Sequence, residues 1–346
     1  MFRKMTEILL IVFLSLFFFT STKCYGKDLT WRNYNLSETG IYKGRGLPLF
    51  ILNHDLSVSA FGGTELPEKI APYTFFWGAY NSFQFKNKLN DADGNKVPGN
   101  DEIDIFASVH RLILTTPMEI IPGWSHYFQL VLPVVIMDID SRFEEQAFSV
   151  QTGGIGDIDI GTGFLIPSIY KTKNVKIDSF LSFDITFPTG NYEKDQVTIG
   201  SNVYNIQFGL TNILHFYGIG NGLFCEQDLF LMIPTKNRDF INPVTMNPHS
   251  EYQLGPSFQL ILKLAYKLNE HYKIGMGGFF DYQLSEDKMD GDRIDNSREM
   301  AMGGGPLLVG KFGRFFFDLG LAFDAKVKNR HKGSKVYCIL YYTFGG

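Results

Sequence analysis

Residues 153–192 constrain the fold more than any other part of the chain, because apolar and polar residues alternate there on both sides of a short polar turn at 170–174. Alternation with a period of two is the pattern of a β-strand with one apolar and one polar face. The apolar positions are Ile158, Ile160, Thr162 and Phe164 in the first segment, and Val175, Ile177, Leu181, Phe183, Ile185 and Phe187 in the second. Each segment is about ten to thirteen residues long, against roughly five or six for a usual soluble strand. Strands of this length with one apolar face predict the wall of a transmembrane β-barrel.

The composition agrees with a barrel in lipid. Aromatic residues make up 15% of the 346 residues, with 33 Phe and 17 Tyr, as a lipid-facing band between aromatic girdles requires. The mean hydropathy of -0.04 excludes a polytopic helical membrane protein. The formal charge of -4 gives no strongly basic surface, so we expect no nucleic-acid partner.

The N-terminus has the pattern of an export signal. Arg3 and Lys4 precede an apolar run at residues 8–19, and a polar zone follows at 20–26. We predict a signal peptide at residues 1–26, with cleavage after Ser21 as the rival to cleavage after Gly26 and an uncleaved anchor helix as the alternative. No later run approaches the ~20 apolar residues of a spanning helix. Export without such a helix points to the outer membrane of a Gram-negative bacterium.

Two further regions follow the signal. Residues 27–70 are irregular and contain the apolar patch Leu47–Leu52. If this patch were exposed to water, it would favour aggregation. This segment is predicted to plug the lumen, with a periplasmic leader or a short strand as alternatives. Residues 71–346 are predicted to form one antiparallel up-and-down barrel.

The regular alternation of alternating-pattern segments and turns along the chain predicts the number of strands. The predicted strands are residues 73–86, 102–115, 126–138, 154–167, 175–187, 203–216, 222–232, 252–266, 272–283, 300–309, 314–327 and 335–344. Twelve is an even number, as bacterial single-chain barrels require.

The connections between these strands alternate in length. The longer, polar ones are 87–101, 139–153, 188–202, 233–251 and 285–299, with a shorter last one at 328–334. The short ones are 116–125, 168–174, 217–221, 267–271 and 310–313. Long loops at one end and short turns at the other are typical of an outer-membrane barrel, with the long loops outside the cell.

Two sequence motifs resemble a known bacterial family. GGIGDIDIGTGFLI at residues 153–166 and FDITFPTGNY at 183–192, with the DADG turn at 91–94, are similar to the family described as the MetA-pathway of phenol degradation. The resemblance covers residues 71–344, although Gly345 and Gly346 follow the terminal aromatic Phe344. It implies an outer-membrane barrel and a link to the uptake of aromatic or hydrophobic compounds.

Acidic residues lie on the polar face of the strands at 154–167 and 175–187. Asp157, Asp159, Asp178 and Asp184 are candidate lumen-lining residues, with Lys176 on the same face. One interpretation is an acidic stripe that makes the lumen weakly cation-preferring; the other is a polar network that only maintains the barrel's shape, because barrel interiors are polar.

The other motifs indicate structure rather than chemistry. Pro188, Thr189 and Gly190 predict a structural turn at the end of a strand, with gating as the alternative. Asp91, Asp93 and Asn95 lack the glycine spacing of a helix–loop–helix calcium site, so we expect no metal and no cofactor. Neither H-E-x-x-H nor G-x-S-x-G occurs, and we expect no enzymatic activity.

The sequence therefore predicts an outer-membrane channel for passive passage of small hydrophobic or aromatic molecules. Its expected partners are outer-membrane lipid and such a solute, in an oligomeric state that the sequence does not define. A structural or surface-interaction barrel without transport is the alternative, and a barrel enzyme is a more remote one.

Overall fold

The computed structural model describes residues 74–96, 102–118, 125–143, 146–192, 200–240, 247 and 250–344. The predicted signal peptide and the predicted plug at 27–70 lie outside these ranges. No helix among the described residues has the length and apolar character needed to span a membrane.

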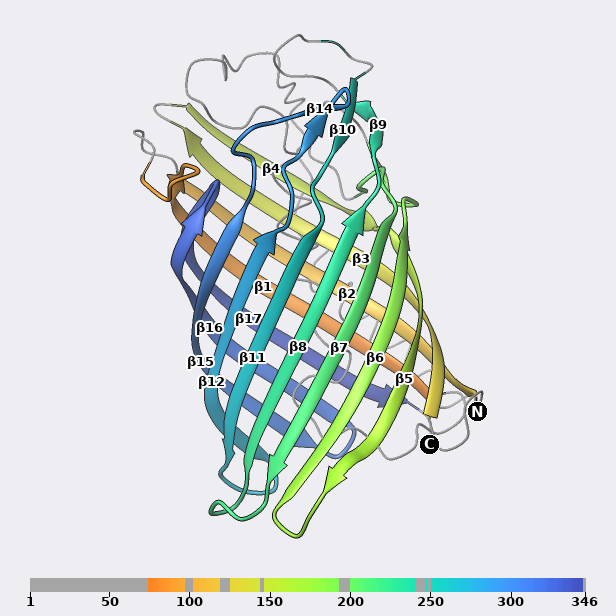
Figure 1. Ribbon diagram of the computed structural model, residues 1–346. Helices are drawn as coiled ribbons and strands as arrows, with labels where there is room; N and C mark the ends of the chain where they lie inside the picture. The colour runs from red at the N-terminus through yellow and green to blue at the C-terminus, as the bar shows by residue number, and fades with distance from the viewer. Residues whose placement is uncertain are drawn as a thin grey trace.

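Long antiparallel strands form the wall of the molecule (Figure 1). These are β1 (Thr74–Asn90), β2 (Glu102–Met118), β3 (Ser125–Phe143), β4 (Gln146–Ile155), β5 (Ile158–Lys171), β6 (Val175–Phe187), β7 (Asn205–Phe216), β8 (Leu223–Pro234), β11 (Ser257–Lys267), β12 (Tyr272–Gln283), β15 (Met300–Phe312), β16 (Phe315–Lys328) and β17 (Arg330–Phe344). Apart from β4 and β5, which both pair with β3, each wall strand pairs with the next along the chain. The first strand, β1, pairs with the last, β17, with Phe75 opposite Phe344. The wall is therefore a closed up-and-down barrel.

The barrel has twelve wall strands, because β4 and β5 together occupy one position. The upper part of β3 pairs with β4, where Val134 lies opposite Ile155, and the lower part pairs with β5, where Val131 lies opposite Asp159. Gly156 and Asp157 interrupt this strand between the two parts. The predicted twelve-stranded antiparallel barrel is confirmed.

Two of the predicted loops are wrong. In the predicted loop 139–153, residues 139–143 continue β3 and residues 146–153 belong to β4. The inward positions Met137 and Ile139 are apolar and buried, so the alternation of β3 continues past Asp138. Residues 328–334 contain only the turn at Asn329, whose φ of 53° lets β16 reverse directly into β17.

A small second sheet stands at the end of the barrel opposite the short turns, which is the predicted outer end (Figure 1). Its strands are β9 (Asn237–Phe240), β10 (Ser250–Gln253), β13 (Lys288–Met289) and β14 (Asp292–Arg293). Buried Asp287 holds it to the barrel by accepting hydrogen bonds from the Tyr252 hydroxyl (2.7 Å) and the Gly255 amide (3.0 Å). The predicted loops 233–251 and 285–299 are therefore partly folded.

The two faces of the wall differ as a barrel in lipid requires. Along β8, residues alternate strictly between buried inward and partly exposed outward positions. Large apolar side chains are exposed on the outer face, among them Ile160, Leu181, Phe208, Leu319 and Leu321. In water these side chains would favour aggregation, whereas in a bilayer they form the lipid-facing band.

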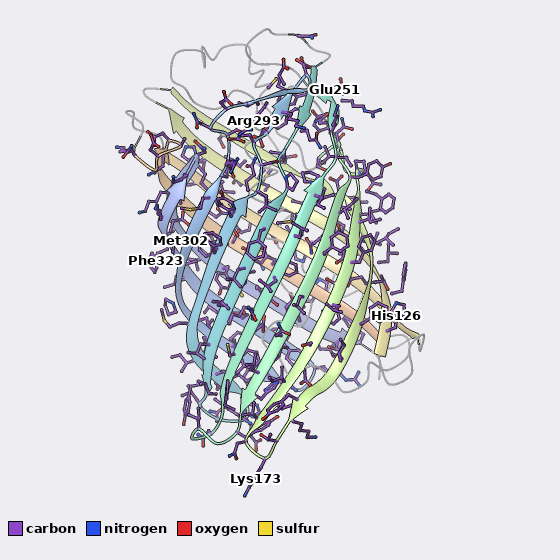
Figure 2. The ribbon with its side chains drawn as sticks, in the orientation of Figure 1. His126, Lys173, Glu251, Arg293, Met302 and Phe323 are labelled. Atoms are coloured by element: carbon purple, nitrogen blue, oxygen red, sulfur yellow. The ribbon has the colours of Figure 1, made fainter. Side chains whose placement is uncertain are left out.

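Labelling of intact cells tests which end of the barrel faces outward. Asp292→Cys, in the exposed outer sheet, should react with an impermeant maleimide on whole cells, because the end with the longer connections is extracellular. Lys173→Cys, in a short turn at the opposite end (Figure 2), is the matched control and should react only after the outer membrane is opened. The reverse result would invert the topology.

Candidate functional site in the barrel lumen

A cavity lies inside the barrel beside the wall made by β8, β11, β12, β15, β16, β17 and β1. The volume of this cavity is about 100 Å³, which is enough for several water molecules at roughly 10–15 Å³ each. Its charged lining residues are three carboxylates and three cations: Asp228, Asp281, Asp324, Lys263, Arg330 and Lys335. The charges of this lining therefore balance.

Lys263 on β11 is the centre of a buried ion cluster. Its Nζ lies 3.1 Å from Oε1 of Glu226 on β8 and 3.2 Å from Oδ2 of Asp318 on β16. The three side chains are 6%, 0% and 1% exposed. In the sheet, β11, β12 and β15 lie between β8 and β16. Lys263 contacts both β8 and β16, so it links separated strands of the wall from inside the barrel.

Glycines continue the row of wall positions that begins at Lys263. Lys263 lies opposite Gly277 on β12, and Gly277 lies opposite Gly305 on β15. A Cβ at Gly277 would lie 3.2 Å from Leu307, and a Cβ at Gly305 would overlap the backbone carbonyl of Leu321, so the wall is closely packed here.

Further hydrogen bonds fix the polar part of the cavity. The Thr211 hydroxyl donates to Asp228 at 2.6 Å, and the Gln259 amide donates to Asp281 at 2.9 Å. Arg330 also pairs with Asp281, at 3.5 Å. The polar wall thus contains two further hydrogen-bonded groups beside the Lys263 cluster, one on β7 and β8 and one on β11, β12 and β17.

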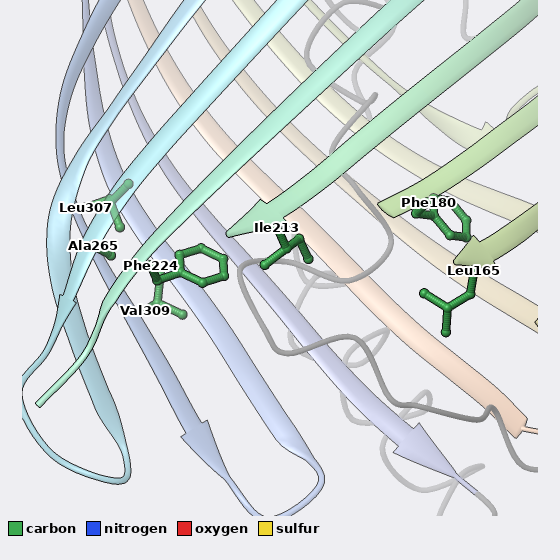
Figure 3. Close-up of a cluster of buried hydrophobic side chains, with 7 residues drawn as sticks. All are labelled: Leu165, Phe180, Ile213, Phe224, Ala265, Leu307 and Val309. Carbon is green, nitrogen blue, oxygen red and sulfur yellow. The ribbon is translucent and has the colours of Figure 1, made fainter. Parts of the chain in front are cut away.

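Below this network the inner wall becomes apolar (Figure 3). One buried cluster contains Leu165, Phe180, Ile213, Phe224, Ala265, Leu307 and Val309, from β5, β6, β7, β8, β11 and β15. Its members lie near the ends of the strands that carry the short turns. The inner face of β3 is also apolar, with buried Val131, Val135, Met137 and Ile139.

The acidic residues predicted to line the lumen have individual partners. Asp178 is buried and pairs with Lys176 at 2.9 Å, while the Thr186 hydroxyl donates to Asp159 at 2.5 Å. The Gln129 amide donates to Asp184. Asp178, Asp159 and Asp184 share the inward-facing side of their strands. Their predicted effect on ion preference stays a prediction, and these partners reduce the field that the carboxylates exert on a solute.

Asp157 and the predicted turn lie together at the outer end of β5 and β6. The Gly190 amide donates to Oδ1 of Asp157 at 2.8 Å, and the Ser201 amide donates to Oδ2 at 2.8 Å. The Ile158 amide donates to the Thr189 hydroxyl at 3.0 Å. Asp157 therefore anchors the segment after Pro188 rather than extending a stripe down the wall.

Gly161 separates Gln129 on β3 from Asp184 on β6, and a Cβ there would overlap the Asp184 carboxylate. Gly161→Leu should therefore break their hydrogen bond and destabilise the barrel by about 1–3 kcal/mol, as overpacking does. The midpoint of urea unfolding, followed by the gel mobility shift of the folded barrel, measures this. Gly218→Leu, in an exposed short turn where the nearest atoms to a Cβ are those of Asn174 at 3.4–3.6 Å, controls for the added side chain. An unchanged midpoint in Gly161→Leu would contradict the packing described.

The described residues hold no group of three or more His, Cys, Asp or Glu side chains suited to a metal ion. Two of the cations that line the cavity, Lys263 and Arg330, form ion pairs with carboxylates of the wall. What the arrangement offers chemically is a graded inner surface, polar at mid-height and apolar toward one end.

Comparison with solved structures supports the fold. The chain is similar to an outer membrane channel from Pseudomonas putida F1, with a TM-score of 0.66, 16% identity, and coverage of 83% of this chain and 100% of that one. It also matches the transport unit of the autotransporter AIDA-I from Escherichia coli, with a TM-score of 0.49, 9% identity, and coverage of 88% and 100%. The first likeness supports the barrel fold; the second is too distant to carry an argument. No curated protein matches the chain.

The barrel fold and its lipid-facing surface place the protein in the outer membrane, as predicted. A family profile matches residues 86–338, which is well over half of the chain and includes most of the wall strands. The chain belongs to the family described as "Putative MetA-pathway of phenol degradation".

Proposed function

We propose that the protein is a passive channel for small apolar molecules, including aromatic ones, across the outer membrane. The apolar cluster on the inner wall carries this proposal. Water-filled barrels have polar interiors, so an apolar inner surface indicates a solute with apolar surface of its own. In the charged cavity above the cluster, Lys263 and Arg330 are each held by carboxylates of the wall.

The comparisons support the same proposal. The Pseudomonas putida F1 structure, which matches 83% of this chain, is an outer membrane channel, and that function reaches this protein only by analogy. We propose no catalytic role.

Uptake of a neutral apolar dye by intact cells tests the channel. The dye 1-N-phenylnaphthylamine fluoresces on entering membrane, and an intact lipopolysaccharide layer slows its entry. Cells producing the protein should take it up faster than cells producing a variant with Ile213→Gln and Leu307→Gln, which places amides in the apolar cluster. Leu319→Gln, on the outer face, is the control for a single amide elsewhere in the wall. Equal uptake with and without the protein would favour the alternative of a surface-interaction barrel, to which the folded outer sheet would contribute.

A further inference from the structure

A β-bulge in β16 turns lysine side chains toward the outer face of the barrel. Met302 of β15 lies opposite Lys326, whereas the next residue, Gly303, lies opposite Asp324. Ala325 is therefore an extra residue in β16, with no counterpart in β15. A bulge of this kind shifts the inward–outward alternation of its strand by one residue. Met302 is 41% exposed on the outer face (Figure 2), so Lys326 opposite it points outward as well.

Two more lysines join Lys326 on this part of the outer face. Lys328 lies two residues further along β16, and Val327 between them is inward and buried. Lys332 comes from β17, and its ammonium group donates a hydrogen bond to the carbonyl of Ala325, in the bulge, at 2.7 Å. We call Lys326, Lys328 and Lys332 the lysine rim.

An apolar row directly precedes the lysine rim along β16. The outward residues of this row are Phe315, Phe317, Leu319, Leu321 and Phe323. The row covers residues 315–323, and a tilted strand needs about nine to eleven residues to cross the hydrocarbon layer. The lysine rim therefore lies where the hydrocarbon ends and the lipid head groups begin, at the end of the barrel opposite the short turns.

The lysine rim carries a net positive charge. In the described part of the chain, neither Lys326 nor Lys328 forms an ion pair. The turn 91–95 lies beside Lys328, since a Cβ at Gly94 would be 3.7 Å from Cγ of this lysine. That turn contains two aspartates, and the carboxylate of Asp91 accepts hydrogen bonds from two amides of its own turn. Three ammonium groups beside two carboxylates leave the rim positive.

We propose that the lysine rim binds the phosphate groups of a phosphorylated glycolipid in the outer leaflet, with the acyl chains of this lipid against the apolar row. Hydrogen bonds from an ammonium group to a phosphate are charge-assisted and about twice as strong as neutral ones. A phosphorylated lipid matches both the charge and the apolar row below it, whereas a free phosphate ion matches the charge alone. This site lies on the outer face of the wall and does not depend on the proposed channel function.

Binding of lipid A to the purified protein in detergent, measured by native mass spectrometry, tests the proposal. The natural protein should bind diphosphoryl lipid A about tenfold more tightly than the same lipid without its phosphates, because lysines near an anionic lipid surface favour binding. The variant with Lys326→Gln, Lys328→Gln and Lys332→Gln should lose this difference. Arginine at the same three positions keeps the charge and should preserve it.

A matched variant controls for total charge. Lys171→Gln, Lys173→Gln and Lys267→Gln remove three positive charges from the end with the short turns and should leave both affinities unchanged. Equal binding of the two lipids by the natural protein, or an equal loss of affinity in this control variant, would overturn the proposal. Displacement of lipid A by inorganic phosphate at matched ionic strength would also contradict it, because the lysines would then bind the free ion. Cysteine labelling that inverts the topology would place the rim in the inner leaflet and overturn it as well.

Discussion

Replacing Lys263 with methionine should lower the free energy of unfolding by about 3–5 kcal/mol, the largest effect of any substitution proposed for this protein. The methionine would leave the carboxylates of Glu226 and Asp318 buried without their cation. Removing one partner of a buried ion pair is costly because the remaining charge is uncompensated in a medium of low dielectric constant. Urea unfolding in detergent, read from the mobility of folded and unfolded bands, gives the change.

A triple variant separates the effect of the unpaired buried charges from the effect of the changed side-chain shape. Lys263→Met combined with Glu226→Gln and Asp318→Asn removes the whole cluster and should recover most of the lost stability, since replacing a complete buried ion pair is often neutral. If Lys263→Met alone unfolded at the same urea concentration as the natural protein, the cross-link would contribute nothing to stability.

The second large effect is expected on the outer face. Phe183→Arg should destabilise the barrel by about 2–4 kcal/mol, the cost of an arginine on the lipid face at the bilayer midplane. Phe183 lies well inside β6 and packs against Phe208 on β7, with ring centroids 5.1 Å apart. Folding into phospholipid bilayers, followed by the extent of folding against denaturant, gives the value.

Phe187→Arg is the matched control for this substitution. It lies on the same face at the end of β6, where an arginine side chain can reach the interface and should cost about 0–1 kcal/mol. Similar losses of stability from Phe183→Arg and Phe187→Arg would contradict the placement of Phe183 near the bilayer midplane and of Phe187 near the interface.

The wall of the barrel could be predicted from the sequence because it depends on local patterns. The bounds of β6 and β12 agree with the prediction to the residue, since alternation stops at clear turn residues on both sides. The ends of β3 and β4 are not predicted, because Asp140 and the polar residues after it suggest a loop that begins at residue 139. Asp138 and Asp140 occupy the outward-facing side of a strand whose inward side remains apolar.

The cavity could not be predicted in the same way. Glu226, Lys263 and Asp318 are far apart in the sequence, and only the closed sheet brings them together. One signal was present: each is a charged residue at an inward position in the middle of a predicted strand, where an unpaired charge would be costly. The acidic residues near the two motifs were more conspicuous, and their neighbours on other strands could not be identified from one sequence.

The pairing of Phe75 with Phe344 joins residues 269 positions apart, since 344 minus 75 is 269. Until β17 has been exported, the growing sheet has two edges with unpaired amide and carbonyl groups, which hydrocarbon cannot satisfy. A contact of such long range forms late, because loop closure must be completed before the pairing is gained. The barrel can therefore close and insert stably only after β17 has been exported. A chain that ends before Arg330 should form no stable barrel in the membrane.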